Sequence, residues 1–284
     1  MRRPRVAIVT GNVVPADAAG LKYARLGPIG VAAARAYAAR HGYAFRDTLS
    51  EVGPRPACWA KIPALLAALE THDWAVWIDS DAVALAPERD LAEVLDGDAD
   101  VVAQDPDAFF ADLGLDPALG RASQPLHTCV FALRAGAWAR ALLCDAWAMT
   151  QFVKPAIPWN GVGEQEAINA VRKRRPPEPG RIRWVADLQA PPRLAGAQTR
   201  FVHFYGDRAA PLVPEAVAAR VLDAFAAAVA AGRGRDCDLG LVHLSAIQKS
   251  APGGPIDRGG PERFGYDRDA LLAAARPFMR EAAA

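Results

Sequence analysis

The sequence contains little cysteine and no excess of charge of either sign. Its 284 residues include four cysteines, which lie far apart and form no Cys-x-x-Cys pair. This spacing gives neither a disulfide framework nor the ligand pattern of a zinc site, so we expect reduced thiols. The formal net charge is +1, from 33 basic and 32 acidic residues, which gives no bulk signal for binding nucleic acid or an acidic membrane surface.

Long apolar runs are also absent. No segment approaches the roughly 20 consecutive apolar residues that span a bilayer, so we expect no transmembrane segment. The N-terminus is basic, as in a signal peptide, but Gly11, Asn12, Pro15 and Asp17 interrupt the apolar run that follows. With reduced thiols and no export signal, the expected location is cytoplasmic.

What the sequence does contain is an ordinary globular composition with alternating strand and helix patterns. Hydrophobic residues make up 52% of the chain and charged residues 23%, enough for a substantial core. Apolar runs typical of strands cover residues 5–10, 43–47, 75–78 and 100–104, and helical patterns lie between them at residues 29–40 and 59–70. This alternation predicts an α/β fold with a mixed, mostly parallel central sheet flanked by helices.

The rest of the chain is less regular. We expect a short helix over residues 87–95 and a long loop over residues 105–125. Further strands are expected at residues 127–134, 181–185, 200–203 and 239–246, and further helices after Gly136 and at residues 163–171, 214–231 and 269–281. No boundary is evident before Gly232, so we predict one domain over residues 1–232. Residues 233–284 would form a C-terminal extension packed on it, a candidate acceptor element.

The chain is organised around the strand at residues 75–78, which ends in Asp79-Ser80-Asp81. Its unbroken apolar run fits a strand buried on both faces, and open α/β sheets bind ligands at the carboxyl ends of such strands. In extended backbone Asp79 and Asp81 would point the same way, where two carboxylates repel unless a cation shares the site. A divalent ion, Mg²⁺ or Mn²⁺, would serve and would also bind a diphosphate. The alternative is that Asp79 caps the next turn and Asp81 is solvated.

Two other places near the strand ends carry candidate ligand-binding residues. Gly11 and Asn12 follow the first strand, where glycine permits close backbone approach and the amide offers hydrogen bonds; a plain turn is the alternative. Lys61 lies in the first turn of a helix, which is unfavourable for a cation under the helix dipole. That position indicates a phosphate or carboxylate partner, unless the lysine is simply solvated.

Later in the chain, an apolar strand contains His203, and Gly206 and Arg208 follow it closely. An imidazole, bare backbone and a cation together would suit a metal-bound diphosphate, although a lone strand histidine is usually a satisfied core residue. Glu164 begins a helix, where an acidic side chain suits the dipole, so a purely structural role is the alternative there.

Taken in order, these motifs resemble the galactosyl/xylosyl/mannosyl-transferase family, which includes plant xyloglucan xylosyltransferases and fungal galactomannan galactosyltransferases. The resemblance extends over about residues 5–210, and it rests on an ordered set rather than on one motif. The set is Tyr37-x-x-x-His41-Gly42-Tyr43, Trp59-Ala60-Lys61, Trp77-Ile78-Asp79-Ser80-Asp81-Ala82, residues 128–134, Asp145-Ala146-Trp147, Glu164-Gln165 and His203-x-x-Gly206-x-Arg208.

The resemblance implies a GT-A fold, a nucleotide-diphosphate-sugar donor, a divalent metal that is usually Mn²⁺, and transfer with retention of anomeric configuration. By position, the metal ligands would be Asp79, Asp81 and His203. Gln165 and Glu164 would lie near the sugar, and Arg208 would act with the metal on the charge of the departing diphosphate. The donor-binding set would be Thr10, Gly11, Asn12, Lys61, Asp79, Ser80, Asp81, Thr128, Gly206 and Arg208.

The sequence departs from the family pattern in three respects. Cys129 stands where the family commonly has glycine, beside the sugar pocket, and Gly163 replaces an acidic residue before Glu164. No transmembrane anchor precedes the domain, so a Golgi-type location does not transfer. A UDP-linked hexose or pentose is the favoured donor, whereas the acceptor is not named by the sequence.

Two other functions fit parts of the pattern. A nucleotidyltransferase on a related sheet usually has a glycine-rich loop with a basic residue after its first strand, which residues 11–14 do not supply. A non-catalytic protein that binds a nucleotide sugar or a partner would retain the fold without the chemistry. The presence of Asp79, Asp81, His203 and Arg208 favours an enzyme over that alternative.

Overall fold

The computed structural model of the chain describes residues 3–13, 22–48, 55–95, 97–112, 116–118, 126–153, 162–177, 180–205, 212–247 and 260–280. Its contacts form two compact units, each made of several segments. The first unit is Met1–Gly11, Ala34–Asp79 and Pro87–Gln189, and the second is Asn12–Ala33, Ser80–Ala86 and Ala190–Ala284.

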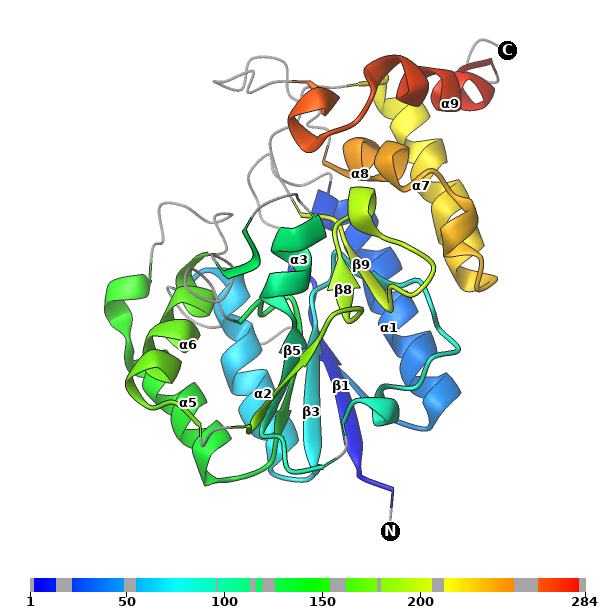
Figure 1. Cartoon of the computed structure of the whole chain (residues 1–284). Coiled ribbons are helices and arrows are strands. Elements are labelled where there is room, and N and C mark those ends of the chain that lie inside the picture. The colour runs from blue at the N-terminus through cyan, green and yellow to red at the C-terminus, as the bar shows by residue number, and fades with distance from the viewer. Residues whose placement is uncertain are drawn as a thin grey trace. The chain divides into compact units, whose positions relative to one another are not determined.

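The first unit contains a six-stranded sheet in the order β2-β1-β3-β6-β5-β7. Figure 1 labels three of its strands, β1, β3 and β5. Strand β1 pairs in parallel with β2 and β3, and β5 pairs in parallel with β7. Only β6 is antiparallel to its neighbours among the described strands of this sheet. The predicted mixed, mostly parallel sheet is therefore confirmed. The strands are β1 Val6–Thr10, β2 Ala44–Asp47, β3 Trp74–Ile78, β5 Val101–Gln104, β6 Val130–Arg134 and β7 Ile182–Val185.

One face of this sheet is covered by α2 (Lys61–Leu69), α5 (Ala137–Ala148) and α6 (Val162–Arg174), which lie together in Figure 1. Alternate residues of β1 and β3 pack with these helices in one buried apolar cluster, as the two-residue period of a strand requires. Those residues are Ala7, Val9, Ala75 and Trp77. The 3₁₀ turn η2 (Ala57–Ala60) leads directly into α2, so the helix predicted at residues 59–70 is confirmed in outline.

Two predictions for this unit were wrong. The expected helix at residues 87–95 is reduced to a 3₁₀ turn, η3 (Leu91–Glu93), because the Asp90 side chain accepts the Ala92 N–H and starts a single turn there. The expected loop at residues 105–125 instead contains α3 (Pro106–Asp112). Asp105 accepts the Asp107 N–H at 2.9 Å, and a proline suits the first helical position, so this helix begins with ordinary signals. Residues 113–115 and 119–125 lie outside the described part.

The second unit contains a small sheet in the order β4-β9-β8, with β4 (Ala82–Ala84) antiparallel to β9 (Phe201–His203). Strand β8 (Gln189–Ala190) and helix α1 (Gly27–His41) each extend across the boundary between units along the chain. Helices α7 (Glu215–Ala230), α8 (Leu239–Ala246) and α9 (Arg268–Arg280) form an apolar cluster with β4 and β9. The shorter elements are η1 Lys22–Leu26, η4 Thr150–Phe152, η5 Pro192–Leu194, η6 Gly234–Asp236 and η7 Pro261–Phe264.

Residues 239–246 form helix α8 rather than the predicted strand. Asp238 caps this helix by accepting the Leu241 N–H at 3.0 Å. Residues 240–246 are all buried, so the run shows no one-sided apolar period from which a helix could be told from a strand. The predicted division of the chain at residue 232 stays a prediction.

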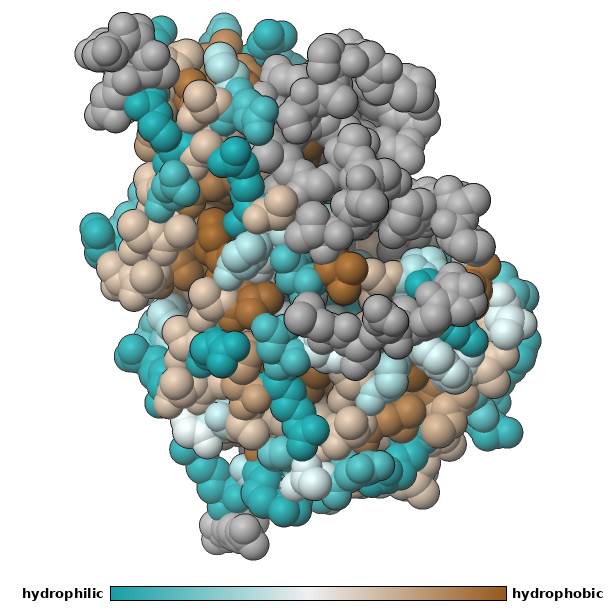
Figure 2. All heavy atoms as spheres, turned by 180° about the vertical axis from the view of Figure 1, so that it is seen from behind, coloured by the Kyte–Doolittle hydropathy of each residue, from teal (hydrophilic) through white to brown (hydrophobic). Residues whose placement is uncertain are grey.

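Among the described residues, no helix is both long enough and apolar enough to cross a membrane. On the face drawn in Figure 2, apolar residues reach the surface in several separate areas among hydrophilic residues.

Candidate functional site

The carboxyl end of β3 carries the first of the two predicted aspartates. Strand β3 ends at Ile78, and the Asp79 N–H donates to the Cys129 carbonyl at 2.8 Å, which extends the pairing with the β6 side by one residue. The Trp77 indole N–H donates to the Asp79 carboxylate. Ser80 and Asp81 lie in a turn, so extended backbone does not persist through the motif. The extended backbone that would make Asp79 and Asp81 point the same way is therefore not present.

Lys61 is the centre of the site in the first unit. Its side chain is only 3% exposed, and its Nζ lies 2.9 Å from Glu164 Oε1 and 3.4 Å from an Asp79 oxygen. It also donates to the Thr128 carbonyl oxygen at 2.8 Å. Helix α2 therefore directs its first side chain toward the end of β3, the segment before β6 and the start of α6. The carboxylate partner expected for Lys61 is confirmed.

Burial and charge oppose each other at Lys61. Burial by itself lowers the pKa of the ammonium group, but the carboxylates of Asp79 and Glu164 outweigh it, and the net pKa is raised. Lys61 is thus a fixed cation at any working pH. Beside it, burial raises the pKa of the Cys58 thiol, and the Glu164 charge raises it further. Cys58 therefore remains a neutral thiol.

Helix α6 is fixed to the segment before β6 by two side chains one turn apart. Gln165 Oε1 accepts the Thr128 N–H at 2.9 Å. Asn169 holds Leu126 in both directions, since its Oδ1 accepts the Leu126 N–H and its Nδ2 donates to the Leu126 carbonyl at 2.9 Å. Asn169 is a site residue that sequence reasoning missed. A single polar residue one turn after Glu164-Gln165 gave the only signal for it.

Glu164 combines deep burial with unequal use of its two oxygens. The residue is 2% exposed, and Oε1 is the oxygen paired with Lys61. Among the described residues Oε2 has no hydrogen-bond partner, although the Cys58 thiol is near enough to interact with the carboxylate. A buried acceptor of this kind is costly unless a ligand or water bonds to it.

The second predicted aspartate, Asp81, lies in the second unit and is 4% exposed. Lys22 Nζ lies 2.5 Å from its Oδ2, and His203 Nε2 lies 3.3 Å from its Oδ1. Burial by itself raises the pKa of this carboxyl, but Lys22 and then His203 outweigh it, and the pKa is held well below its usual range. Asp81 is therefore a carboxylate, and the alternative of a solvated Asp81 was wrong.

Lys22 is the second residue that sequence reasoning missed. It is buried in the short π-helix η1, just before α1. It follows residues 14–21, whose composition carries neither a helical nor a strand period, so no pattern indicated that its ammonium group would be buried.

The turn that contains Ser80 is held by close packing against the start of α1. Ser80 Oγ donates to Asn12 Oδ1 at 3.1 Å, and Asn12 Nδ2 donates to the Tyr23 carbonyl at 2.8 Å. A Cβ atom at Gly30 would lie 1.9 Å from the Ser80 carbonyl oxygen, so only glycine allows this approach. The structure thus brings together Asn12 and Ser80, two of the predicted donor-binding residues.

Thr10 and Gly11 end β1 in the first unit. Thr10 is fully buried, and its Oγ1 has no hydrogen-bond partner among the described residues. A Cβ at Gly11 would lie 2.3 Å from the Thr48 carbonyl oxygen, so packing alone already requires a glycine there. Gly206 and Arg208, predicted to bind the diphosphate, lie outside the described residues.

Comparison with solved structures supports the class of fold. The crystal structure of a glycosyltransferase involved in the glycosylation of the major capsid of PBCV-1 matches 72% of this chain and 95% of its own, with a TM-score of 0.51 and 16% identity. At that identity the likeness shows the fold alone, which is the GT-A-like fold predicted from the sequence. The glycosyltransferase GlyE of Streptococcus pneumoniae TIGR4 aligns over 95% of this chain and 62% of its own, with 14% identity and a TM-score of 0.37.

A family match adds the class of enzyme, and with the fold it indicates that the chain is a glycosyltransferase. The family is the galactosyl transferase GMA12/MNN10 family, whose sequence model matches residues 18–99. The matched segment includes Lys22, Lys61 and the Asp79-Ser80-Asp81 motif. The family match and the fold support the glycosyltransferase family predicted from the ordered motifs. No curated protein gives a significant match.

Proposed function

We propose that the protein is a metal-dependent retaining glycosyltransferase that moves a hexose or pentose from a UDP-sugar to an acceptor. The observation that carries this proposal is the buried network of Lys61, Asp79 and Glu164 at the carboxyl end of β3. Removing Lys61 and Glu164 from water costs free energy, so a network of this kind is retained where the charges are needed. Lys61 and Asp79 also lie within the segment that matches the transferase family.

The predicted metal ligands have side-chain atoms of the kind that bind a divalent ion. We assign Asp79, Asp81 and His203 as ligands of Mn²⁺ or Mg²⁺. Asp81 Oδ1 and His203 Nε2 are 3.3 Å apart, close to the roughly 3 Å that separates neighbouring ligands on a small octahedral ion with bonds of about 2.1 Å. In the first unit, Asp79 has a carboxylate oxygen within 4.8 Å of Cys129 Sγ, which makes the thiol a further candidate ligand. When bound, the metal would stabilise the negative charge of the departing diphosphate.

The chain's own residues then have separate tasks. Lys61 pairs with Glu164 Oε1 and fixes the direction of its side chain, and we assign Glu164 Oε2 as an acceptor for a hydroxyl group of the donor sugar. Gln165 is fixed through its bond to Thr128, beside Glu164. Either side chain would stabilise positive charge at the sugar carbon on the face opposite the leaving group. Arg208 is assigned to the diphosphate because a guanidinium group stays protonated at any working pH.

The other residues predicted to bind the nucleotide sugar are assigned to the same role in this proposal. Thr10 and Gly11 at the end of β1, Asn12 and Ser80 in their hydrogen-bonded pair, and Gly206 are assigned to the nucleotide and diphosphate. The cytoplasmic setting expected from the cysteine spacing remains part of this proposal. We assign residues 233–284 to the acceptor side.

Donor binding tests the proposal directly. Melting temperatures would be measured with UDP-, GDP- and dTDP-linked sugars, each with and without Mn²⁺, since a ligand of the folded state raises the melting temperature by mass action. We expect a Mn²⁺-dependent rise with a UDP-sugar, and its loss in Asp81→Asn. Asp223→Asn, an exposed helix position, is the matched control and should keep the rise.

A folded protein that no nucleotide sugar stabilises would overturn the donor assignment. Binding without hydrolysis or transfer across a broad acceptor panel would favour the non-catalytic alternative. For an active enzyme, the product anomer read by NMR separates retention from inversion.

A further inference from the structure

A polar pocket lies in the first unit, at the other end of the sheet from Asp79. Its volume is about 400 Å³, and its walls come from the starts of β5 and β7, the end of β6 and the start of α5. In the register of the sheet Arg134 pairs with Trp74 at the start of β3, whereas Val130 pairs with Ile78 next to Asp79. At about 3.3 Å per residue, the two ends of β3 are roughly 13 Å apart. The pocket is therefore separate from the Lys61 network.

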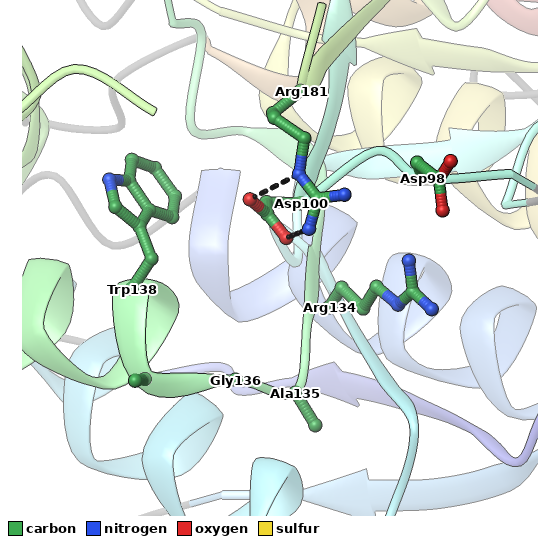
Figure 3. Close-up of a pocket in the computed structure, with 8 residues that line it drawn as sticks. Asp98, Asp100, Arg134, Ala135, Gly136, Trp138 and Arg181 are labelled. Carbon is green, nitrogen blue, oxygen red and sulfur yellow. Dashed lines mark hydrogen bonds and ion pairs between the residues drawn. The ribbon is translucent and has the colours of Figure 1, made fainter. Parts of the chain in front are cut away.

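One wall of the pocket is a fixed aromatic ring. Trp138 is half-buried, packs against the main apolar cluster of this unit, and donates its indole N–H to the Arg175 carbonyl at 3.1 Å. Figure 3 shows the ring on one side of the pocket, with Asp100 and Arg181 across from it. The bond to Arg175 and the core packing fix the plane of the ring before any ligand arrives.

The opposite wall offers both donors and acceptors of hydrogen bonds. Arg181 donates two hydrogen bonds to the Asp100 carboxylate, from Nε to Oδ2 at 2.9 Å and from a terminal nitrogen to Oδ1 at 2.7 Å. Arg134 donates one of its nitrogens to the Gly97 carbonyl at 3.0 Å, and Asp98 is exposed at the rim. Two arginines and two aspartates cancel in formal charge. The pocket therefore has no net charge to attract either a phosphate or a metal ion.

The floor of the pocket is made of very small residues. Ala135, Gly136 and Ala137 are exposed, and a Cβ built at Gly136 would meet no atom within 4 Å. The open space beside the ring therefore results from side chains no larger than a methyl group at these three positions, and at Gly136 it can be filled by substitution without displacing neighbours.

We propose that this pocket binds a neutral glycan, with one sugar ring stacked on Trp138. A sugar ring has an apolar C–H face that suits an aromatic surface, and its hydroxyl groups need donors and acceptors at the edge, which Arg134, Arg181 and Asp100 supply. The volume is within the 300–1,000 Å³ or so typical of small-ligand sites. The site goes beyond the transfer reaction, because it would hold a glycan at a second place that needs neither the donor nor the metal.

The test uses fluorine NMR of the full chain labelled with 5-fluorotryptophan. Trp138→Phe identifies the Trp138 signal by its loss and keeps an aromatic ring in the core. The probes are neutral tetrasaccharides of glucose, galactose, mannose and xylose, with inorganic phosphate as the charged control. We expect the Trp138 signal to shift saturably with at least one tetrasaccharide and not with phosphate.

A variant that fills the pocket with a larger side chain shows whether the binding occurs in this pocket. Gly136 has a φ of 176°, an extended conformation open to any residue, so Gly136→Leu should fold and should weaken glycan binding at least tenfold. Gly196→Leu, at a second glycine with open space, is the matched control and should bind normally.

The two outcomes that overturn the proposal are clear. One is a folded, labelled protein whose Trp138 signal does not shift with any neutral tetrasaccharide at millimolar concentration. The other is Gly136→Leu that binds as tightly as the wild type. Donor-induced stabilisation by UDP-sugars should be the same in Gly136→Leu and the wild type, so a failure of the transferase assignment is distinguishable from a failure here.

Discussion

At the scale of single residues, each of the two units contains buried charges that are paired with charges of the opposite sign. Lys61 faces Asp79 and Glu164, and Lys22 faces Asp81. In each case the partner's charge outweighs the cost of burial, as the directions of the pKa shifts of Lys61 and Asp81 show. Removing one member of a buried pair should therefore be far more disruptive than removing both.

Lys61→Met is expected to lower the free energy of unfolding by about 3–5 kcal/mol, because Glu164 is left as a buried charge without a partner. The double variant Lys61→Met/Glu164→Gln should recover a large part of that loss. Urea unfolding at neutral pH measures both. Glu166→Gln on the same helix is the matched control. A free energy of unfolding of Lys61→Met within about 1 kcal/mol of the wild-type value would contradict a stabilising role for the Lys61 network.

Lys22 pairs with Asp81 Oδ2, so its positive charge would compete with a metal ion for the Asp81 carboxylate. If Asp81 is a ligand, Lys22→Met should strengthen Mn²⁺ binding in the absence of donor by about tenfold, equal to about 1.4 kcal/mol. Electron paramagnetic resonance of free Mn²⁺ gives the dissociation constant. Lys22→Arg keeps the charge, so this variant should not bind Mn²⁺ more tightly than the wild type. Weaker Mn²⁺ binding by Lys22→Met would contradict competition between Lys22 and the metal ion.

At the scale of elements, α8 gives the second unit a buried histidine. His243 is 1% exposed, lies among the rings of Phe204, Phe264 and Tyr266, and contacts the Tyr205 carbonyl through Nε2 at 2.6 Å. Burial lowers the pKa of His243 to about 4, although the bond to Tyr205 raises it in part. The imidazole is therefore neutral in the folded chain, and Nε2 carries the proton that Tyr205 accepts.

This histidine predicts acid sensitivity. Because its pKa is lower in the folded than in the unfolded chain, the unfolded chain binds more protons between pH 6.5 and about 4. Stability is fully present above pH 6.5 and falls by up to about 3 kcal/mol as the pH decreases to about 4. His243→Gln keeps a hydrogen-bond donor for the Tyr205 carbonyl but does not titrate. Between pH 7 and pH 4.5 the variant should therefore lose less free energy of unfolding, measured with urea, than the wild type. An equal loss in both proteins would contradict a neutral His243.

The elements also show what a sequence can predict. The strands of the main sheet and the long helices were predicted because their apolar patterns are one-sided or continuous over whole elements. The strand predicted at residues 239–246 was wrong because a run buried on all sides has no period. The short helix α3 was missed because its signals, Asp105 and Pro106, lie among residues that also favour loops.

At the scale of the whole molecule, the predicted site residues belong to both compact units. Asp79 ends a segment of the first unit and Ser80 begins a segment of the second. The motif could be found from the sequence because its residues are consecutive. Lys22 and Asn169 could not, since their partners lie far along the chain and only folding brings them into contact.

The central claim is metal-dependent transfer from a UDP-sugar, and release of UDP from the donor tests it most directly. Release would be followed with and without Mn²⁺ in the wild type, in Asp79→Asn and Asp81→Asn, and in Asp223→Asn as control. The account predicts Mn²⁺-dependent release in the wild type and the control and a loss of at least 100-fold, about 2.7 kcal/mol, in both site variants. Wild-type release that is equally fast after removal of all divalent metal, or unchanged in the two site variants, would contradict it.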